Sequence, residues 1–123
     1  MSGRHILIID DSNTNVVLLE SLLVRNGYTV ASALNAREGF ETIKDRVPDL
    51  IYLDLIMPEV SGLEFLQIIR DNESWKNIPV VIISAISDSE TIQKTKELGV
   101  TEYITKPLNI SSIVSLTNNL LNN

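Results

Sequence analysis

The chain has 123 residues, and its 44% hydrophobic and 21% charged content is that of a globular domain that buries its own core. It has no cysteine and one histidine, which excludes disulfide frameworks, thiolate nucleophiles and metal sites built from several histidines. A net charge of −6 disfavours direct binding to nucleic acid or to an anionic membrane. The first apolar stretch is too short for a signal peptide or a membrane helix, so we expect a cytoplasmic protein.

Short runs of β-forming residues alternate with helical patterns along the chain. In chain order we predict a strand over residues 6–9, a helix between Ser12 and Gly27, a strand over 29–33, a helix from Ala36 to Val47, a strand over 50–53, a helix from Ser61, a strand over 80–83, a helix over 88–98, a strand over 102–105 and a helix capped by Asn109. The first, third and fourth strands lack polar alternation, which is typical of strands buried on both faces of a parallel sheet. The order predicts one α/β domain over residues 1–123, with helices on both faces of the sheet.

Polar residues follow four of the five predicted strands. Asp10 and Asp11 follow the first strand, Asp54 the third, Ser84 the fourth and Lys106 the fifth. Because sites in open α/β sheets form outside the carboxyl ends of the strands, we expect these side chains to meet at one edge.

The expected cluster has the composition of a phosphoryl-transfer site. Three neighbouring carboxylates repel one another unless a cation compensates them, and carboxylate and carbonyl oxygens are ligands that Mg²⁺ prefers. An Asp carboxylate can also act as a nucleophile and form an aspartyl phosphate. Lys106 offers a cation for phosphoryl oxygens, and Ser84 offers a hydroxyl donor.

Four motifs at these strand ends carry a family resemblance. They are Ile8-Ile9-Asp10-Asp11, Leu53-Asp54-Leu55-Ile56-Met57-Pro58 with Gly62, Ile83-Ser84-Ala85, and Tyr103-Ile104-Thr105-Lys106-Pro107. With 30 residues from Asp54 to Ser84 and 22 from Ser84 to Lys106, the chain resembles the receiver domain of two-component response regulators over essentially its whole length. The resemblance implies a flavodoxin-like, doubly wound (βα)5 fold with a five-stranded parallel sheet in the order 2-1-3-4-5. It also implies a phosphorylation-dependent signalling switch in a phosphorelay.

The resemblance assigns a role to each site residue. Asp54 is expected to accept the phosphoryl group, and Asp10 and Asp11 to hold Mg²⁺ together with the Asp54 carboxylate and the backbone carbonyl of Ile56. Lys106 is expected to pair with the acyl phosphate.

The remaining roles concern the switch. Ser84 is expected to move and hydrogen-bond the phosphoryl group, and Tyr103 to turn inward behind it. For Tyr103, simple packing is as good an interpretation. The family also suggests a cis peptide bond before Pro107, which proline permits.

The sequence departs little from the family pattern. Serine stands at position 84, where threonine is commoner, and the variable positions two residues after Asp54 and after Ser84 are apolar, namely Ile56 and Ile86. Because neither isoleucine can orient an attacking water, we expect slow hydrolysis of the phosphoryl group.

Three alternatives were weighed against the switch. An aspartate-nucleophile phosphatase needs a second acid where Ile56 stands, and a flavin-binding module needs a phosphate loop where Asp10 and Asp11 stand. A degenerate receiver that only binds partners is disfavoured by the full set of acids, hydroxyl and lysine. We therefore expect a signalling domain that catalyses only its own phosphorylation and dephosphorylation, and is not otherwise an enzyme.

The expected partners are proteins. A histidine kinase or a histidine phosphotransfer protein is expected to donate the phosphoryl group, and a downstream target to bind the surface of the fourth helix, fifth strand and fifth helix. The fourth helix has a thin apolar stripe of Ile92 and Leu98, so we hypothesise that it is weakly held and can shift. The chain carries no output domain, and a stand-alone protein and a receiver cut from a hybrid kinase fit it equally. His5 is expected to be solvated, far from the site.

Overall fold

The computed structural model describes residues 4–121, so the ends of the expected domain, residues 1–3 and 122–123, lie outside it. Strands and helices alternate without exception in the described part. The elements are β1 (His5–Ile9), α1 (Asn13–Arg25), β2 (Thr29–Ala33), α2 (Ala36–Asp45), β3 (Leu50–Leu53), α3 (Gly62–Asp71), β4 (Val80–Ser84), α4 (Ser89–Glu97), β5 (Glu102–Thr105) and α5 (Ile110–Leu121).

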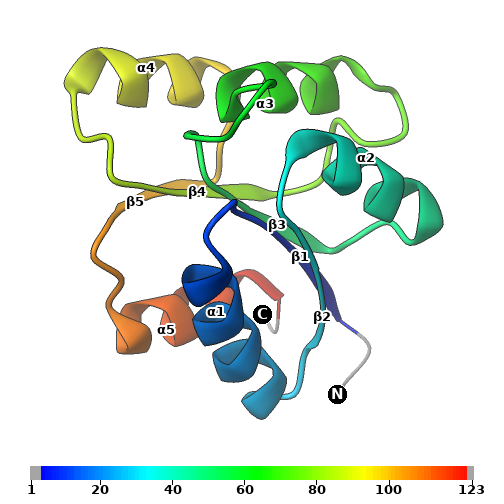
Figure 1. The fold of residues 1–123 in the computed structure, drawn as a ribbon, viewed down its shortest axis with the longest axis vertical. Coiled ribbons are helices and arrows are strands. Elements are labelled where there is room, and N and C mark those ends of the chain that lie inside the picture. Colours follow the sequence, from blue (N-terminus) through cyan, green and yellow to red (C-terminus); the bar gives the residue numbers. More distant parts are fainter. Residues whose placement is uncertain (1–3, 122–123) are drawn as a thin grey trace.

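The sheet is parallel throughout, with the strand order β2-β1-β3-β4-β5. Helices α1 and α5 cover one face, while α2, α3 and α4 cover the other (Figure 1). The predicted doubly wound α/β fold is therefore confirmed. In residues 4–121 none of the helices combines the length and the apolar character needed to cross a membrane.

Two hydrophobic cores lie on the two faces of the sheet. Alternate residues of β1 divide between them, with Leu7 and Ile9 facing α2 and α3, and Ile6 and Ile8 facing α1 and α5. Every residue of β1, β3 and β4 is buried, as the continuous apolar runs predicted. The edge strands β2 and β5 are partly exposed.

Polar side chains begin the helices where the sequence places them. Ser12, Asn35 and Asp88 each accept a hydrogen bond from a backbone N–H in the first turn of the helix that follows. Ser61 and Glu64 form a reciprocal capping box at the start of α3. Asn109 accepts from the N–H of Ser112 and caps α5 as predicted.

Two local predictions were wrong. Helix α2 ends at Asp45, so Val47 lies outside it and is 52% exposed instead of continuing the apolar stripe. His5 belongs to β1 and is buried, because its ring bonds the Thr29 hydroxyl and its N–H donates to Asp49. It does lie at the opposite end of β1 from Asp10, as expected.

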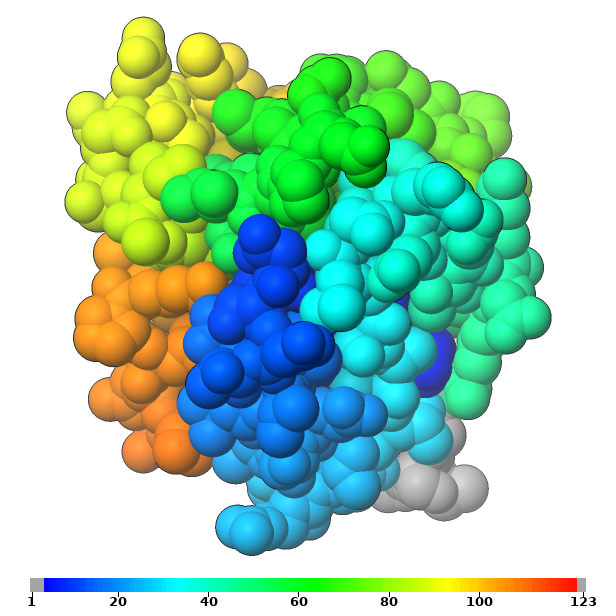
Figure 2. Space-filling view, in the orientation of Figure 1, coloured from blue at the N-terminus to red at the C-terminus, as the bar shows by residue number. Residues whose placement is uncertain are grey.

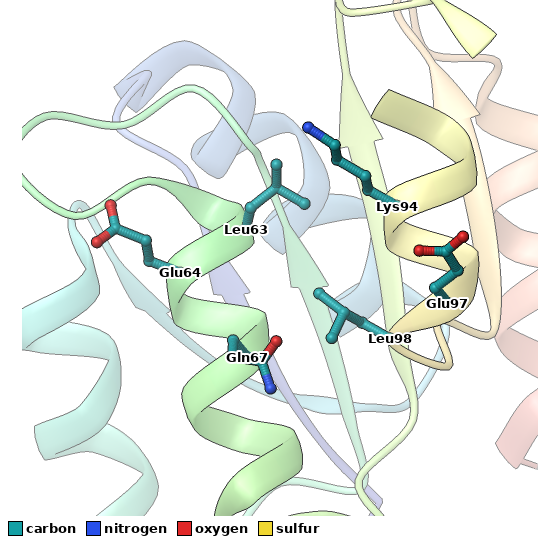
Figure 3. Close-up of a pocket in the computed structure, with 6 residues that line it drawn as sticks. All are labelled: Leu63, Glu64, Gln67, Lys94, Glu97 and Leu98. Atoms are coloured by element: carbon teal, nitrogen blue, oxygen red, sulfur yellow. The ribbon is translucent and has the colours of Figure 1, made fainter. Parts of the chain in front are cut away.

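Helix α4 is held differently from the other helices. In the part of the chain that the structure describes, it buries a single residue, Thr95. A groove of about 350 Å³ separates it from α3, with Leu63 and Leu98 facing each other across it (Figure 3). The predicted thin stripe is therefore matched by thin packing.

Candidate functional site

The carboxyl ends of β1 and β3 bring three carboxylates together. One oxygen from each of Asp10, Asp11 and Asp54 lies within 4.8 Å of the others. Asp10 is 3% exposed and Asp54 is 5% exposed, while Asp11 is open to solvent. In the space-filling view the segment after β1 reaches the surface beside the segment after β3 (Figure 2). The site therefore has two buried acids, Asp10 and Asp54, and is open to solvent at Asp11.

Backbone pairing fixes Asp54 at the end of β3. Its N–H donates to the carbonyl of Ile9 at 2.9 Å, which continues the β1–β3 ladder by one residue. Its Oδ1 accepts from the N–H of Ile56 at 3.1 Å, and its Oδ2 accepts from Lys106 Nζ at 3.2 Å. One oxygen is thus held by the backbone and the other by a cation that can move.

Lys106 reaches the acids from the end of β5. Its Nζ lies 3.3 Å from Asp10 Oδ2 and 3.2 Å from Asp54 Oδ2, and its backbone N–H donates to the carbonyl of Ser84 at 2.9 Å. The Lys106–Pro107 peptide bond is cis, as the resemblance implied. A single ammonium therefore bridges the two buried carboxylates.

The electrostatics follow from this sharing of one cation. Burial raises the pKa of Asp54, the N–H of Ile56 lowers it, and the Asp10 carboxylate raises it further, so that Lys106 compensates only in part. For Lys106, burial lowers the pKa, but Asp10 and Asp54 outweigh it and the net shift is upward. The site thus keeps its lysine charged and holds a carboxylate that is costly to ionise.

Ser84 and Tyr103 bond the backbone of the same residue, Ile86. Ser84 is fully buried, and its Oγ accepts from the N–H of Ile86 at 3.1 Å. The Tyr103 hydroxyl donates to the carbonyl of Ile86 at 2.6 Å, and burial raises the pKa of Tyr103. Both residues therefore hold the loop between β4 and α4.

The loop after Asp54 is shaped by a close approach and an unusual turn. Gly62 packs so tightly that a Cβ there would lie 2.6 Å from the carbonyl oxygen of Asp54. Glu59 has φ +67°, and the N–H of Val60 donates to the carbonyl of Pro58 at 2.8 Å, which makes a γ-turn. Ile56 is 53% exposed beside the acids.

The donor set fits a hard divalent cation. Every ligand that the acids offer is a carboxylate oxygen, which suits Mg²⁺ and does not suit a soft metal. Three carboxylates and one ammonium leave two negative charges uncompensated. The cluster can therefore hold Mg²⁺ next to the Asp54 carboxylate.

Sequence reasoning missed the groups that orient Asp10. Its Oδ1 accepts from the N–H of Ser12 at 2.9 Å, and its Oδ2 accepts from Asn15 Nδ2 at 3.4 Å as well as from Lys106. An asparagine in the first turn of a helix carries no signal of its own. The five predicted polar site residues, by contrast, all lie at the predicted edge.

Comparison with known proteins gives a consistent result. Residues 6–118 match the family model of the response regulator receiver domain. The chain is 28% identical over 111 residues to the polar-differentiation response regulator DivK of Brucella anthropi, covering 90% of each chain. A two-component response regulator from Clostridium difficile superimposes with a TM-score of 0.90 at 27% identity, over 97% of this chain and 96% of that one.

Two further solved structures are similar. The Vibrio cholerae chemotaxis protein CheY4 superimposes with a TM-score of 0.89 at 26% identity, over 96% of this chain and 98% of its own. The signal receiver domain of a histidine kinase from Syntrophus aciditrophicus does so at 0.89 and 30% identity, over 98% of this chain and 91% of its own.

Proposed function

This chain belongs to the response regulator receiver domain family, and from that premise we propose that Asp54 is the residue that accepts the phosphoryl group. The protein is a phosphorylation-dependent switch of two-component signalling. The observation that carries the residue assignment is the contact of Lys106 with both buried carboxylates, Asp10 and Asp54. Receivers bind Mg²⁺ at an acidic site, and we assign that role here to Asp10, Asp11 and Asp54, with the carbonyl of Ile56.

The transfer step requires alignment and charge compensation. The donor is a phosphohistidine of a kinase or phosphotransfer protein. A carboxylate oxygen of Asp54 forms a bond to phosphorus while the phosphorus–nitrogen bond breaks, and the departing imidazole nitrogen takes a proton. Mg²⁺ supplies neutralisation of the phosphoryl oxygens when bound, and Lys106 Nζ pairs with one of them.

The hydrogen bonds of Ile86 connect this step to the surface. The Ser84 oxygen accepts from the N–H of Ile86 and its hydroxyl hydrogen can donate to a phosphoryl oxygen, so a movement of Ser84 toward that oxygen would displace Ile86 with it. The carbonyl of the same residue accepts from Tyr103, so the loop, the tyrosine and the start of α4 respond together. Because α4 packs thinly and borders a groove, we propose that the surface of α4, β5 and α5 binds the downstream target.

Hydrolysis of the acyl phosphate is expected to be slow. We propose that the domain catalyses its own phosphorylation and its own dephosphorylation by water, with no other substrate. Ile56 and Ile86 stand two residues after Asp54 and Ser84, and their apolar side chains cannot orient a water molecule toward the acyl phosphate. We also propose that it works in the cytoplasm, without direct contact with nucleic acid or membrane.

The test is NMR spectroscopy during titration with Mg²⁺ and then beryllofluoride, a phosphoryl mimic. In the wild type we expect the mimic to shift the resonances of Ser84, Tyr103 and the loop around Ile86. Asp54→Asn removes the acceptor and should abolish these shifts, whereas Asp71→Asn, an exposed acid on α3, should keep them. If Mg²⁺ binds and the mimic changes nothing in the wild type, the site is a metal site without a switch.

A further inference from the structure

A closed set of hydrogen bonds joins Asp10 to the first turn of α1. Asp10 Oδ1 accepts from the N–H of Ser12 at 2.9 Å, Ser12 Oγ accepts from the N–H of Asn15 at 3.4 Å, and Asn15 Nδ2 returns to Asp10 Oδ2 at 3.4 Å. The cap of the helix and the carboxylate therefore determine each other's position. We propose that Asn15 is a positioning residue that holds the Asp10 carboxylate for Mg²⁺ and for phosphoryl transfer, an inference that rests on the proposed function.

The burial of Asp10 makes such a donor necessary. A carboxylate that is 3% exposed has lost nearly all contact with water, and each of its oxygens needs a partner inside the protein. Oδ1 accepts from the Ser12 N–H, while Oδ2 accepts from Lys106 and Asn15 alone within residues 4–121. Because a carboxylate only accepts, the nitrogen of the Asn15 amide must face it, so Asn15 does not serve as a metal ligand there.

The two donors to Asp10 Oδ2 differ in whether they keep this contact during the proposed reaction. Lys106 is shared between Asp10 and Asp54, and in the proposed reaction it follows the phosphoryl group on Asp54. Asn15 is part of α1, and its own backbone N–H donates to the capping hydroxyl of Ser12. It therefore remains at Asp10 when Lys106 leaves. Its amide is also neutral, so it orients the carboxylate without competing with Mg²⁺ for the negative charge of the cluster.

The experiment measures Mg²⁺ affinity and phosphorylation of the whole chain. Asn15→Leu keeps the branched connectivity of the side chain and removes the donor. We expect it to weaken Mg²⁺ binding by about tenfold or more, the usual effect of losing an outer-shell partner. With a small-molecule phosphoryl donor, we expect the rate to fall at limiting Mg²⁺ and to recover largely at saturating Mg²⁺. Thermal unfolding without Mg²⁺ reports on folding separately.

Matched variants distinguish positioning from a structural role. Asn13→Leu makes the same substitution at an exposed position in the same turn and should leave Mg²⁺ affinity within twofold of the wild type. Asn15→Gln retains a carboxamide donor and should restore part of the affinity; Asn15→Ala removes the donor without an apolar branch and replaces Asn15→Leu if that variant does not fold. Wild-type Mg²⁺ affinity in Asn15→Leu, or in Asn15→Ala where Asn15→Leu does not fold, would overturn the inference. Absence of Mg²⁺ binding and phosphorylation in the wild type would instead overturn the proposed function.

Discussion

Helices α5 and α4 lie on opposite faces of the same sheet and are held in opposite ways (Figure 1). Helix α5 buries Ile113, Thr117 and Leu121, and the hydroxyl of Thr117 bonds that of Tyr52 in β3. Helix α4 buries only Thr95 among the described residues and faces α3 across a groove (Figure 3). The difference teaches that packing against the sheet is distributed unevenly. The α5 side is densely packed, and the α4 side is thinly packed.

One residue attaches the thinly packed α4 at a single end. Arg70 in α3 donates to the carbonyls of Leu98 and Gly99, just beyond α4, at 2.8 and 3.0 Å. It also donates to the carbonyls of Lys76 and Ile78 at 3.2 and 2.9 Å. The C-terminal end of α4 is therefore attached to the body of the domain, while its N-terminal end follows the loop that Ser84 and Tyr103 hold.

The largest contrast should come from truncating one isoleucine on each helix. Ile113→Ala in α5 opens a cavity in the core and should lower the free energy of unfolding by about 3 kcal/mol. Ile92→Ala in α4 removes a partly exposed side chain and should cost under about 1 kcal/mol. Urea unfolding followed by the fluorescence of Trp75 measures both. Equal costs would show that α4 is as firmly packed as α5.

A pair of tyrosines sharpens the comparison through their hydroxyls. Tyr52→Phe removes the buried bond to Thr117 and should lower the free energy of unfolding by about 1 kcal/mol, more than Tyr103→Phe does. Burial raises the pKa of Tyr52 from 10.0 to about 12, so the fold favours its neutral form. The stability that the fold gains from holding Tyr52 neutral is present below pH 10.0 and is lost as the pH rises toward about 12. The wild type should therefore lose stability over that range more steeply than Tyr52→Phe, and parallel curves would contradict this account.

The attachment of α4 can be broken at Arg70. Arg70→Met keeps an unbranched apolar stem and removes all of the donors, leaving carbonyls at the end of α4 without their partner. We expect amide hydrogen exchange to accelerate by about tenfold near Gly99 and Val100, with little change in α5. Lys96→Met, an exposed change on α4, is the control. Acceleration spread evenly over the domain would argue against a local attachment.

The smallest expected effect lies at the far end of the sheet, away from both helices. Burial lowers the pKa of His5, Arg46 lowers it further, and Asp49 opposes the shift. The fold thus favours neutral His5, and the stability gained is present above the ordinary pKa of 6.5 and lost as the pH falls below it. His5→Gln should reduce this acid sensitivity by a few tenths of a kcal/mol, measured by thermal unfolding between pH 7 and 5. Steeper acid sensitivity in the variant would count against it.

Local patterns explain which parts of the molecule the sequence predicts. Apolar runs define β1, β3 and β4, and capping side chains such as Ser61 mark where helices begin. The parallel order then brings Asp10, Asp54 and Lys106 to one edge, because each of them directly follows a strand.

What the sequence could not supply depends on contacts that only the folded chain makes. His5 is buried beside Thr29 on β2 and Asp49 just before β3. Asn15 gains its importance only because the fold turns the first helical turn back onto Asp10. Gly62 belongs to the motif after Asp54, but the reason for glycine there, the start of α3 against the backbone of Asp54, is visible only in the structure.

The left-handed backbone of Glu59 gives the protein room for improvement by directed evolution. Side chains rarely adopt a φ of +67°, and holding one there costs on the order of 1–3 kcal/mol. A glycine would adopt the same turn without that cost, so a library restricted to position 59 should yield more stable variants with the acids unchanged. A single substitution at Glu59, in the loop that follows the proposed phosphoacceptor Asp54, is therefore expected to stabilise the fold.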